Sequence, residues 1–403
     1  MRLDRRSFLK FLGAAALSTQ PGCREPGRYT DADAAALERH WREERERSGT
    51  GPYGVQRFRG YRGLAELPYF ELDSAGALRC TVEDLPRIID IHAHLGMSLL
   101  MAPEIDLGAH GERVQHYLDC DAQIPGCPLD LDVYANANFT QRDLQVLRWN
   151  VVSQLLWGSR AAATHTIPNL IAEMDAVRIA EAVILPIAFG LPFGDDLYER
   201  WRDAIVREGA ERRLRMGASV HPRDPNAVET LHRAAAEGAC IVKLHPAAQR
   251  FFADSEEAAP IYDACGALGL PVMFHGGRAG IEPEYSHPFN LIRHYEGAFR
   301  DFPKVKFVLA HAGARDVAGA IPLAQRYSNV WLGIHGQGVT VLAQLVEEVG
   351  PNRLLFGTDW PFYHLAATLA KVLLVTEGRP EQRRAILRDN AMGLLGSGAQ
   401  AFT

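Results

Sequence analysis

The sequence lacks three features that would narrow its class at once. Its N-terminal apolar run, residues 11–17, is far shorter than the roughly 20 residues of a membrane span. Basic residues are not in excess, because 43 Lys and Arg stand against 49 Asp and Glu. The net charge of −6 therefore argues against nucleic acid as a partner bound through a basic face. The six cysteines include no CxxC pair and no Cys/His zinc spacing, so cysteine is not the expected metal ligand.

What the sequence does have is ordinary globular composition. Of its 403 residues, 47% are hydrophobic and 23% are charged, enough to bury one large core or two smaller ones. Disorder as the main state is thereby excluded.

The first residues predict an export signal, assigned to 1–22. Paired Arg5 and Arg6, followed by Phe-Leu-Lys and an Ala-rich stretch, resemble a twin-arginine signal. The resemblance implies the twin-arginine export machinery as a partner and a periplasmic or envelope location. Cleavage after Ser18 and a lipid anchor at Cys23 are both open, as is an ordinary amphipathic helix in place of a signal. In an oxidising compartment, Cys120 and Cys127 could pair as a disulfide.

The rest of the chain divides by pattern into an extension (23–85), one large domain (86–395) and a tail (396–403). The extension predicts a helix over 31–47 and a small hairpin over 70–82. In the large domain, short β-branched runs alternate with amphipathic segments such as 226–237, 258–268, 291–302 and 339–349. The expected strands are 88–92, 182–186, 215–220, 240–244, 271–274, 306–310, 330–334 and 354–357.

Eight strand-plus-helix units predict an α/β fold, a (β/α)₈ TIM barrel, with a doubly wound sheet as the alternative.

One connection between these units is much longer than the others. Some seventy residues, 96–166, separate the first strand from a helix expected near 169–179, and they include a helical stretch over 141–157. Because long loops in compact domains are usually functional, this insertion is predicted to be a lid over the barrel mouth.

Histidines gather where the expected strands end. His92 and His94 end the first strand, and alternation puts both side chains on the same side. Later strand ends carry His221, Lys243, His245, His275, His311, His335 and Asp359. In a barrel these ends converge on one face, where several imidazoles and one carboxylate form a ligand set for zinc or a similar divalent metal. Each histidine alone is equally compatible with a packed core or rim position.

Five motifs in this order resemble the amidohydrolase superfamily, in its amidohydrolase-related branch of metal-dependent hydrolases and decarboxylases. They are IDIHAHLG (89–96), VKLHP (242–246), LPVMFHGG (270–277), FVLAHAG (307–313) and LLFGTDWP (354–361). The resemblance implies that His92, His94, His275 and Asp359 hold one zinc or other divalent ion. It also implies that His311 acts beside the metal, as base, as orienting residue or as extra ligand. Relatives often form dimers, so a homodimer is a further expectation.

Lys243 and four neighbours complete the expected site. Elsewhere in the superfamily a fourth-strand lysine is carbamylated and bridges two metals, so Lys243 is open to that role, to substrate binding or to a structural one. Arg278 and Arg315 could clamp a substrate carboxylate or carbonyl. His245 is a further substrate-binding candidate, and Trp360 could form an apolar wall. For each, rim packing or a solvated position is the plain alternative.

These observations favour a metal-dependent hydrolase of a small molecule. It would cleave an amide, lactone or ester through water activated by the metal, with His311 or Asp359 taking the proton. Non-oxidative decarboxylation of an unsaturated or aromatic acid is the alternative on the same site. A non-catalytic periplasmic binding protein on a degenerate barrel is the alternative of another class. Neither the substrate nor the metal follows from the sequence.

Overall fold

The structure, a computed structural model, describes residues 28–111, 113–119 and 128–396. The expected signal, the Cys23 anchor and the Cys120–Cys127 pair lie outside the described residues. The described cysteines, Cys80, Cys240 and Cys265, are buried free thiols. No helix in the described ranges is both long enough and apolar enough to cross a membrane.

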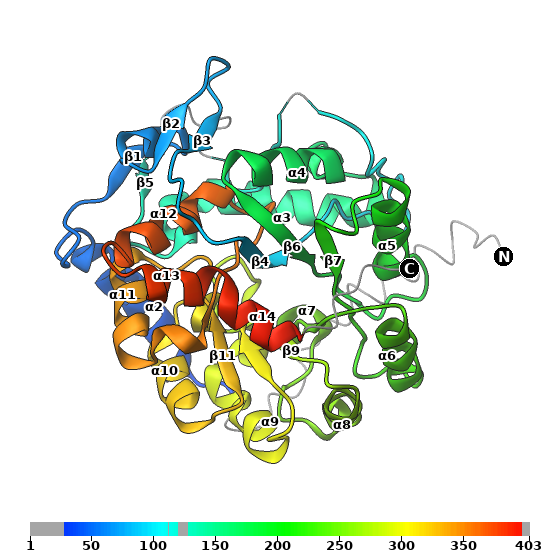
Figure 1. The fold of residues 1–403 in the computed structure, drawn as a ribbon. Helices are drawn as coiled ribbons and strands as arrows, with labels where there is room; N and C mark the ends of the chain where they lie inside the picture. Colours follow the sequence, from blue (N-terminus) through cyan, green and yellow to red (C-terminus); the bar gives the residue numbers. More distant parts are fainter. Residues whose placement is uncertain (1–27, 112, 120–127, 397–403) are drawn as a thin grey trace.

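Eight parallel strands form the centre of the molecule, in two sheets (Figure 1). The three-stranded sheet contains β4 (Ile88–Ala93), β6 (Ile179–Ile184) and β7 (Leu214–Met216). The five-stranded sheet contains β8 (Val242–Leu244), β9 (Val272–Phe274), β10 (Phe307–Leu309), β11 (Val330–Gly333) and β12 (Leu354–Leu355). All eight expected strands are present, most of them shorter than predicted.

Single bridges join the edges of the two sheets. Ala218 pairs with Val242 between β7 and β8, and Ala93 pairs with Trp360 beyond β12. The strands therefore follow one another in chain order around a common axis, as they do in a TIM barrel. The α/β prediction with parallel strands is confirmed, whereas the strands of the described ranges show no reversal of strand order of the kind that defines a doubly wound sheet.

Helices surround the strands on the outside (Figure 1). They are α4 (Ile167–Ala176), α5 (Leu197–Arg207), α6 (Ala227–Ala236), α8 (Ala259–Leu268), α9 (Glu296–Asp301), α10 (Val317–Arg326), α11 (Val339–Glu348) and α12 (Leu365–Val375). In α5, Leu197, Trp201, Ala204 and Ile205 are buried, which is the spacing of one helix face packed on a sheet. The helix predicted over 291–302 is instead two pieces, a 3₁₀ turn at Ile292–His294 and α9. The helix expected near 169–179 ends at Ala176, and Ile179 already begins β6.

One end of the barrel is closed by the C-terminal helices α13 (Pro380–Arg384) and α14 (Asn390–Leu395). Leu394 and Leu395 pack with Ile89, Val183 and Leu355 inside the strands. The functional side chains must therefore lie at the opposite end, where the strands finish.

The insertion after β4 carries β5 (Pro128–Asp130), a 3₁₀ turn (Ala135–Asn138) and α3 (Gln141–Leu156). Its two ends meet, because the amide of Gly96 donates to the carbonyl of His165 over 2.8 Å. Helix α3 begins with a capping box between Thr140 and Asp143. The short helix α7 (Pro246–Gln249) follows β8 on the same side of the barrel.

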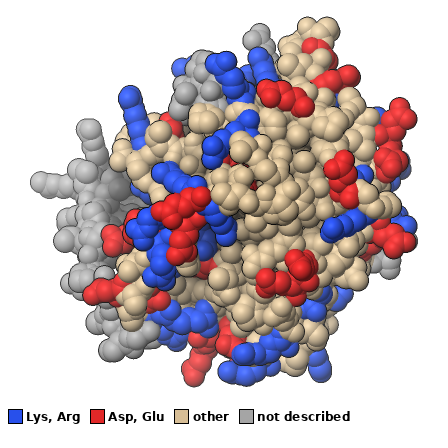
Figure 2. Space-filling model, turned by 90° about the vertical axis from the view of Figure 1, so that its left-hand side faces the viewer, with Lys and Arg blue, Asp and Glu red and all other residues tan. Residues whose placement is uncertain are grey.

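The N-terminal extension packs against the barrel. Helix α2 (Asp31–Arg47) has the predicted bounds, and β2 (Phe70–Leu72) pairs with β3 (Leu78–Cys80) as the predicted hairpin. Strand β1 (Arg57–Arg59) pairs with β5 of the insertion. On the face shown in Figure 2, acidic and basic side chains are interspersed, with no continuous patch of either sign.

Candidate functional site

The first and eighth strands are tied together directly behind the histidine pair. Asp90 is fully buried, and its Oδ1 accepts from the amides of His92 (2.9 Å) and Thr358 (3.0 Å). Its Oδ2 accepts from the Thr358 hydroxyl over 2.5 Å. The amide of Asp359 then donates to the carbonyl of His92 over 2.8 Å. These bonds fix the backbone on both sides of the proposed ligands.

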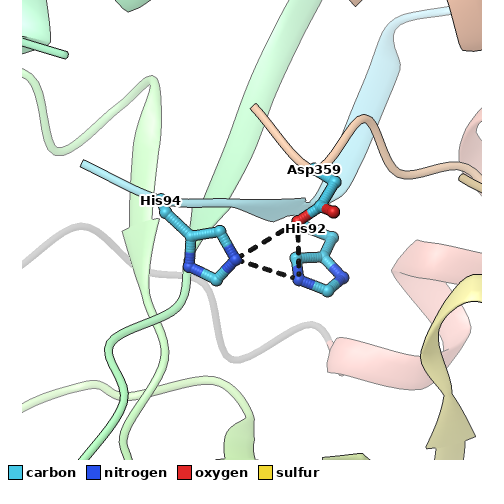
Figure 3. A group of neighbouring side chains, drawn as sticks. All are labelled: His92, His94 and Asp359. Atoms are coloured by element: carbon cyan, nitrogen blue, oxygen red, sulfur yellow. Dashed lines mark hydrogen bonds and ion pairs between the residues drawn. The ribbon is translucent and has the colours of Figure 1, made fainter. Parts of the chain in front are cut away.

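His92, His94 and Asp359 point toward one another (Figure 3). The Nε2 atoms of His92 and His94 are 3.1 Å apart, and Oδ1 of Asp359 lies 3.4 Å from each of these nitrogens. All three side chains are buried. Burial lowers the pKa of His92 well below its usual value, so its imidazole is neutral. Neutral imidazole is the form that binds a metal.

Asp359 and His311 are held in an unusual backbone conformation. Asp359 has φ of 61° and His311 has φ of 59°, both in the left-handed region that residues other than glycine rarely adopt. Such conformations concentrate at functional sites, where the surrounding bonds impose them. In both residues the conformation places the side chain in the cluster.

The three donor atoms fit a divalent cation. Ligand atoms at tetrahedral zinc bond lengths lie about 3.3 Å from one another, close to the separations of 3.1–3.4 Å between these atoms. Nδ1 of His94 is 2.7 Å from the carbonyl of Leu185 and therefore carries the proton. Its Nε2 lone pair then faces the Asp359 carboxylate, an arrangement of acceptors that a cation between them would stabilise.

His311 and His335 form a second group on the same carboxylate. Nε2 of His311 is 3.9 Å from Oδ2 of Asp359. The ring centres of His311 and His335 lie 4.2 Å apart. Among the described residues, two sets of three side chains could hold a metal: His92, His94 and Asp359, or His311, His335 and Asp359. Burial lowers the pKa of His311 well below its usual value and that of His335 to about 3.

His275, predicted as a ligand, belongs to neither set of three and reaches the cluster through His311. Its Nδ1 lies 3.1 Å from Nε2 of His311, and its Nε2 lies 3.1 Å from Oε1 of Glu282. Burial alone would raise the pKa of Glu282, but His275 and backbone amides outweigh it and lower that pKa to about 2. The carboxylate thus holds the Nε2 proton of His275, which leaves Nδ1 directed at the cluster.

Lys243, on β8, lies beside the same cluster of side chains. Its side chain is 1% exposed, and Nζ lies 3.3 Å from Nε2 of His92. Burial lowers the pKa of Lys243 to about 7, while the nearby Asp359 charge acts in the opposite direction. His245, two residues on, stacks on His275 with ring centres 4.1 Å apart, and its Nδ1 accepts from the amide of Ala248.

The two predicted arginine clamps already have neighbours within the fold. Arg278 is buried and binds both carboxylate oxygens of Asp316, and it also donates to the carbonyl of Asp33 in α2. Arg315 lies 3.7 Å from the centre of the Trp41 ring, with its Nε 3.8 Å from Glu44. Both arginines therefore connect the barrel to α2.

Trp360 is fully buried and packs away from open space. Its indole Nε1 donates to Glu173 over 2.9 Å, and the same carboxylate oxygen lies 3.1 Å from Nε2 of His116. The residue following Asp359 is thus anchored to α4 and to the insertion.

Two contacts were not anticipated from the sequence. The Tyr134 hydroxyl, from the insertion, lies 3.1 Å from Nδ1 of His311. Glu282 reaches His275 from the loop after β9. Neither lies at a strand end or in a motif, so the pattern that located the histidines held no signal for them. Asp90 did lie within the first motif, where alternation on the strand places it on the same side as His92 and His94.

Comparison with known proteins agrees with this geometry. A family model described as amidohydrolase matches residues 89–396. The structure is similar to that of IDCase from Metarhizium anisopliae, with 20% identity over 77% of this chain and 97% of the other and a TM-score of 0.52. It also resembles an uncharacterised TIM-barrel protein from Bordetella bronchiseptica, with 22% identity over 60% and 86% of the two chains and a TM-score of 0.50. A 2,6-dihydroxybenzoate decarboxylase from Rhizobium matches at 16% identity over 76% and 98%, with a TM-score of 0.49.

Proposed function

The chain belongs to the amidohydrolase family, and we propose that it is a metal-dependent decarboxylase of a small unsaturated or aromatic acid. Several solved structures that it resembles are named decarboxylases. Those likenesses concern the fold alone, so the choice of reaction comes from the site. We also propose, as the sequence suggests, that the protein works after export.

The observation that carries this proposal is Lys243. It supplies a buried amino group 3.3 Å from the proposed metal ligand His92, with Asp359 as the nearby negative charge. A metal ion together with an amino group that donates hydrogen bonds forms a site for a carboxylate. A decarboxylase requires that its substrate carry a carboxylate, whereas an ester, amide or lactone does not.

Burial of the cluster also supports loss of CO₂. His92, Lys243, His311 and His335 are each at most 3% exposed. Decarboxylation turns a localised carboxylate charge into neutral CO₂ and a charge spread over the unsaturated system, so removal from water favours its transition state.

The chain's own residues can be given roles in this reaction. A divalent cation on His92, His94 and Asp359 would supply positive charge that holds substrate oxygens and withdraws electrons from the reacting carbon. Lys243 binds the carboxylate. The bond between the carboxyl carbon and the unsaturated carbon breaks, its electron pair stays on the latter, and CO₂ leaves. The proton on Nε2 of His311 then passes to that carbon, and solvent replaces it.

Hydrolysis of an amide, lactone or ester remains the second candidate. The observation in its favour is the buried Asp359 carboxylate beside His92 and His94, since a carboxylate at this point is a base that can take a proton from water.

One screen separates the two reactions. The purified protein, supplied with zinc or manganese, is incubated with a panel of unsaturated and aromatic acids and with a matched panel of lactones, esters and amides. Release of CO₂ from an acid is expected, and the Asp359→Asn and Lys243→Met variants should lower its rate at least about 100-fold. Acid release from the second panel without CO₂ from the first would replace decarboxylation by hydrolysis.

His232→Gln is the control. His232 is an exposed histidine on α6, away from the strand ends, so its loss should leave the rate unchanged. If this variant also lost activity, the effect of the site variants could not be assigned to the cluster.

A further inference from the structure

A cavity of about 890 Å³ lies beside the strand ends that carry the cluster. It is lined by the segments that follow β4, β6, β7 and β8, by α3 of the insertion, and by α5 and α6 on the outside. These two helices are neighbours at the right of Figure 1. The cavity thus extends from the strand ends outward between α5 and α6. Its size falls within the range of small-molecule sites.

Two bonds connect the cavity wall to the cluster. The carbonyl of Leu185 receives the Nδ1 proton of His94, and the next residue, Pro186, lines the cavity. The hydroxyl of Ser219, also in the wall, donates to the carbonyl of Lys243 over 2.8 Å. The cavity wall is therefore bonded directly to the backbone of Lys243 and adjoins the residue that binds the His94 ring.

The inner walls are apolar. They are formed by Leu99, Leu155, Ile187, Leu191 and Val220, which come from four different segments of the chain. A site with such walls gains affinity by removing apolar ligand surface from water.

Several charged side chains of the lining contact other groups of the fold. Arg223 binds Glu257, and Arg233 binds Glu199. Asp195 accepts from the amides of Phe189 and Leu191. Arg250, also in the lining, has its guanidinium 5.2 Å from the centre of the Tyr285 ring. The two ion pairs balance their own charges, and the apolar residues of the inner walls provide the surface for an uncharged part of a ligand.

Exposed apolar side chains surround the same opening. On α3, Trp149 is 61% exposed and precedes Val152, a cavity residue, by one helical turn. Trp157, 53% exposed, lies 5.5 Å from the Trp149 ring. Met101 is also exposed, and its amide bonds to the carbonyl of Leu155. An apolar molecule would pass over apolar surface on its way in.

We infer that this cavity binds the apolar body of an amphipathic carboxylic acid whose carboxylate lies at Lys243 and the proposed metal. The inference rests on the proposed function for the position of the carboxylate. The cavity itself defines the rest of the ligand, an uncharged apolar group. The exposed side chains of α3 form the rim of this site.

Calorimetric titration with straight-chain carboxylic acids from butanoate to decanoate tests the inference without any turnover. Each added methylene that enters the cavity should tighten binding by about fourfold at most, the value for full burial of a CH₂ group. The series is measured on the full chain with and without added zinc, because the apolar contribution should not depend on the metal. Affinity that does not change with chain length would overturn the inference.

Two variants alter the cavity by different means. Ile187→Trp fills it from the segment after β6, and Leu155→Arg introduces a charge from α3; both positions are only partly buried. Each variant should remove the dependence of binding affinity on the chain length of the acid. Ile171→Trp is the matched control, because Ile171 is partly buried on α4 and does not line the cavity. If both cavity variants bind decanoate as wild type does, the ligand lies elsewhere.

The two proposals fail separately. Binding that increases with chain length while no acid releases CO₂ would support the cavity and reject the decarboxylase. CO₂ release from short acids, with no effect of chain length or of the two variants on binding, would support the decarboxylase and reject the cavity as the ligand site. Decanoate binding that survives the cavity variants but is lost when α3 is altered at Trp149 would place the ligand on the outer surface and overturn the inference.

Discussion

The hydroxyl of Tyr134 decides which nitrogen of His311 faces the reaction. It lies 3.1 Å from Nδ1, while Nε2 points toward His275 and Asp359. Burial raises the pKa of Tyr134 well above its usual value, so the hydroxyl remains protonated and can donate to Nδ1. His311 would then carry its own proton on Nε2, on the side of the cluster.

Tyr134→Phe should therefore lower kcat about tenfold with little change in KM or metal content. In ¹⁵N-histidine NMR spectra the variant should show a changed tautomer population for His311, a readout that loss of packing alone would not produce. Tyr262→Phe is the control, since Tyr262 is equally buried but donates to the carbonyl of Ala253. An unchanged tautomer in Tyr134→Phe would contradict this role.

The number of metal ions separates two roles of Lys243. Elemental analysis of the wild type should give about one zinc or similar ion per chain, lost in His92→Ala and in Asp359→Ala. Two ions per chain would instead occupy both sets that share Asp359 and would assign Lys243 a carbamylated, bridging role. Metal-free protein with an intact fold would favour the binding-protein alternative.

Individual residues differed in how far the sequence could locate them. His92, His94 and Asp359 follow from strand alternation and from the convergence of strand ends, which are properties of the chain pattern. Arg278 was a candidate substrate clamp because it follows His275, with rim packing as the alternative. Its partners Asp316 and Asp33 lie far away in sequence, so no local pattern indicated them. Glu282 and Tyr134 depend on loop paths that no periodicity determines.

At the scale of elements, the site depends on the junction between β4 and the turn after β12. Asp90 makes this junction through three bonds to His92 and Thr358, all 3.0 Å or shorter. Burial raises the pKa of Asp90 to about 7, although its hydrogen bonds act against that rise. The residue touches no substrate in this arrangement and acts by positioning the ligands.

Asp90→Asn should weaken metal binding about tenfold, the lower part of the range for residues that orient ligands. The substitution keeps the shape but places an amide where the Thr358 hydroxyl donates. Competition with a chelator measures the affinity, and circular dichroism checks the fold. Asp224→Asn is the control, because Asp224 makes a similar bond to the amide of Asn226 at the surface. Equal metal affinity in the wild type, Asp90→Asn and Asp224→Asn would show that the junction does not position the ligands.

The order and type of the elements followed from the sequence far better than their ends did. All eight strands were found, because buried parallel strands form short apolar runs with few alternatives. β7 was expected to continue to Val220, yet its ladder ends at Met216 and the residues beyond it line the cavity. Tertiary contacts, which the local pattern does not contain, determine where each ladder stops.

At the scale of the whole molecule, the extension is part of the barrel's structure. Glu44 of α2 accepts from the amide of Tyr134 and faces Arg315, while Arg28 binds Asp254. Both expected processing points, after Ser18 and before Cys23, precede these contacts. Cleavage at either would leave the residues that make these contacts in the mature chain. Export, lipidation and a homodimer stay predictions.

Stability of the whole chain should depend on a buried ion pair that joins the insertion to α4. His116 and Glu173 lie 3.1 Å apart, and Glu173 also accepts from Trp360. Burial acts against both charges, but their mutual attraction prevails: the pKa of His116 is raised above 6.5 and that of Glu173 is lowered to about 2. The stabilisation from His116 is complete below pH 6.5 and is lost as the pH rises through its folded pKa. That from Glu173 is complete above pH 4.5 and is lost as the pH falls toward 2.

The pair should therefore contribute most between pH 4.5 and 6.5. Glu173→Gln should lower the free energy of unfolding by about 3 kcal/mol at pH 6, the usual cost of leaving one buried charge unpaired. The difference should shrink as the pH rises through the folded pKa of His116, because only the bond from Trp360 then distinguishes the two proteins. Urea denaturation at several pH values measures it. Glu199→Gln, which breaks the exposed pair with Arg233, should cost less than about 1 kcal/mol throughout. A loss in Glu173→Gln that stays constant from pH 5 to 9 would mean that packing, and not the charge of His116, makes this contact stabilising.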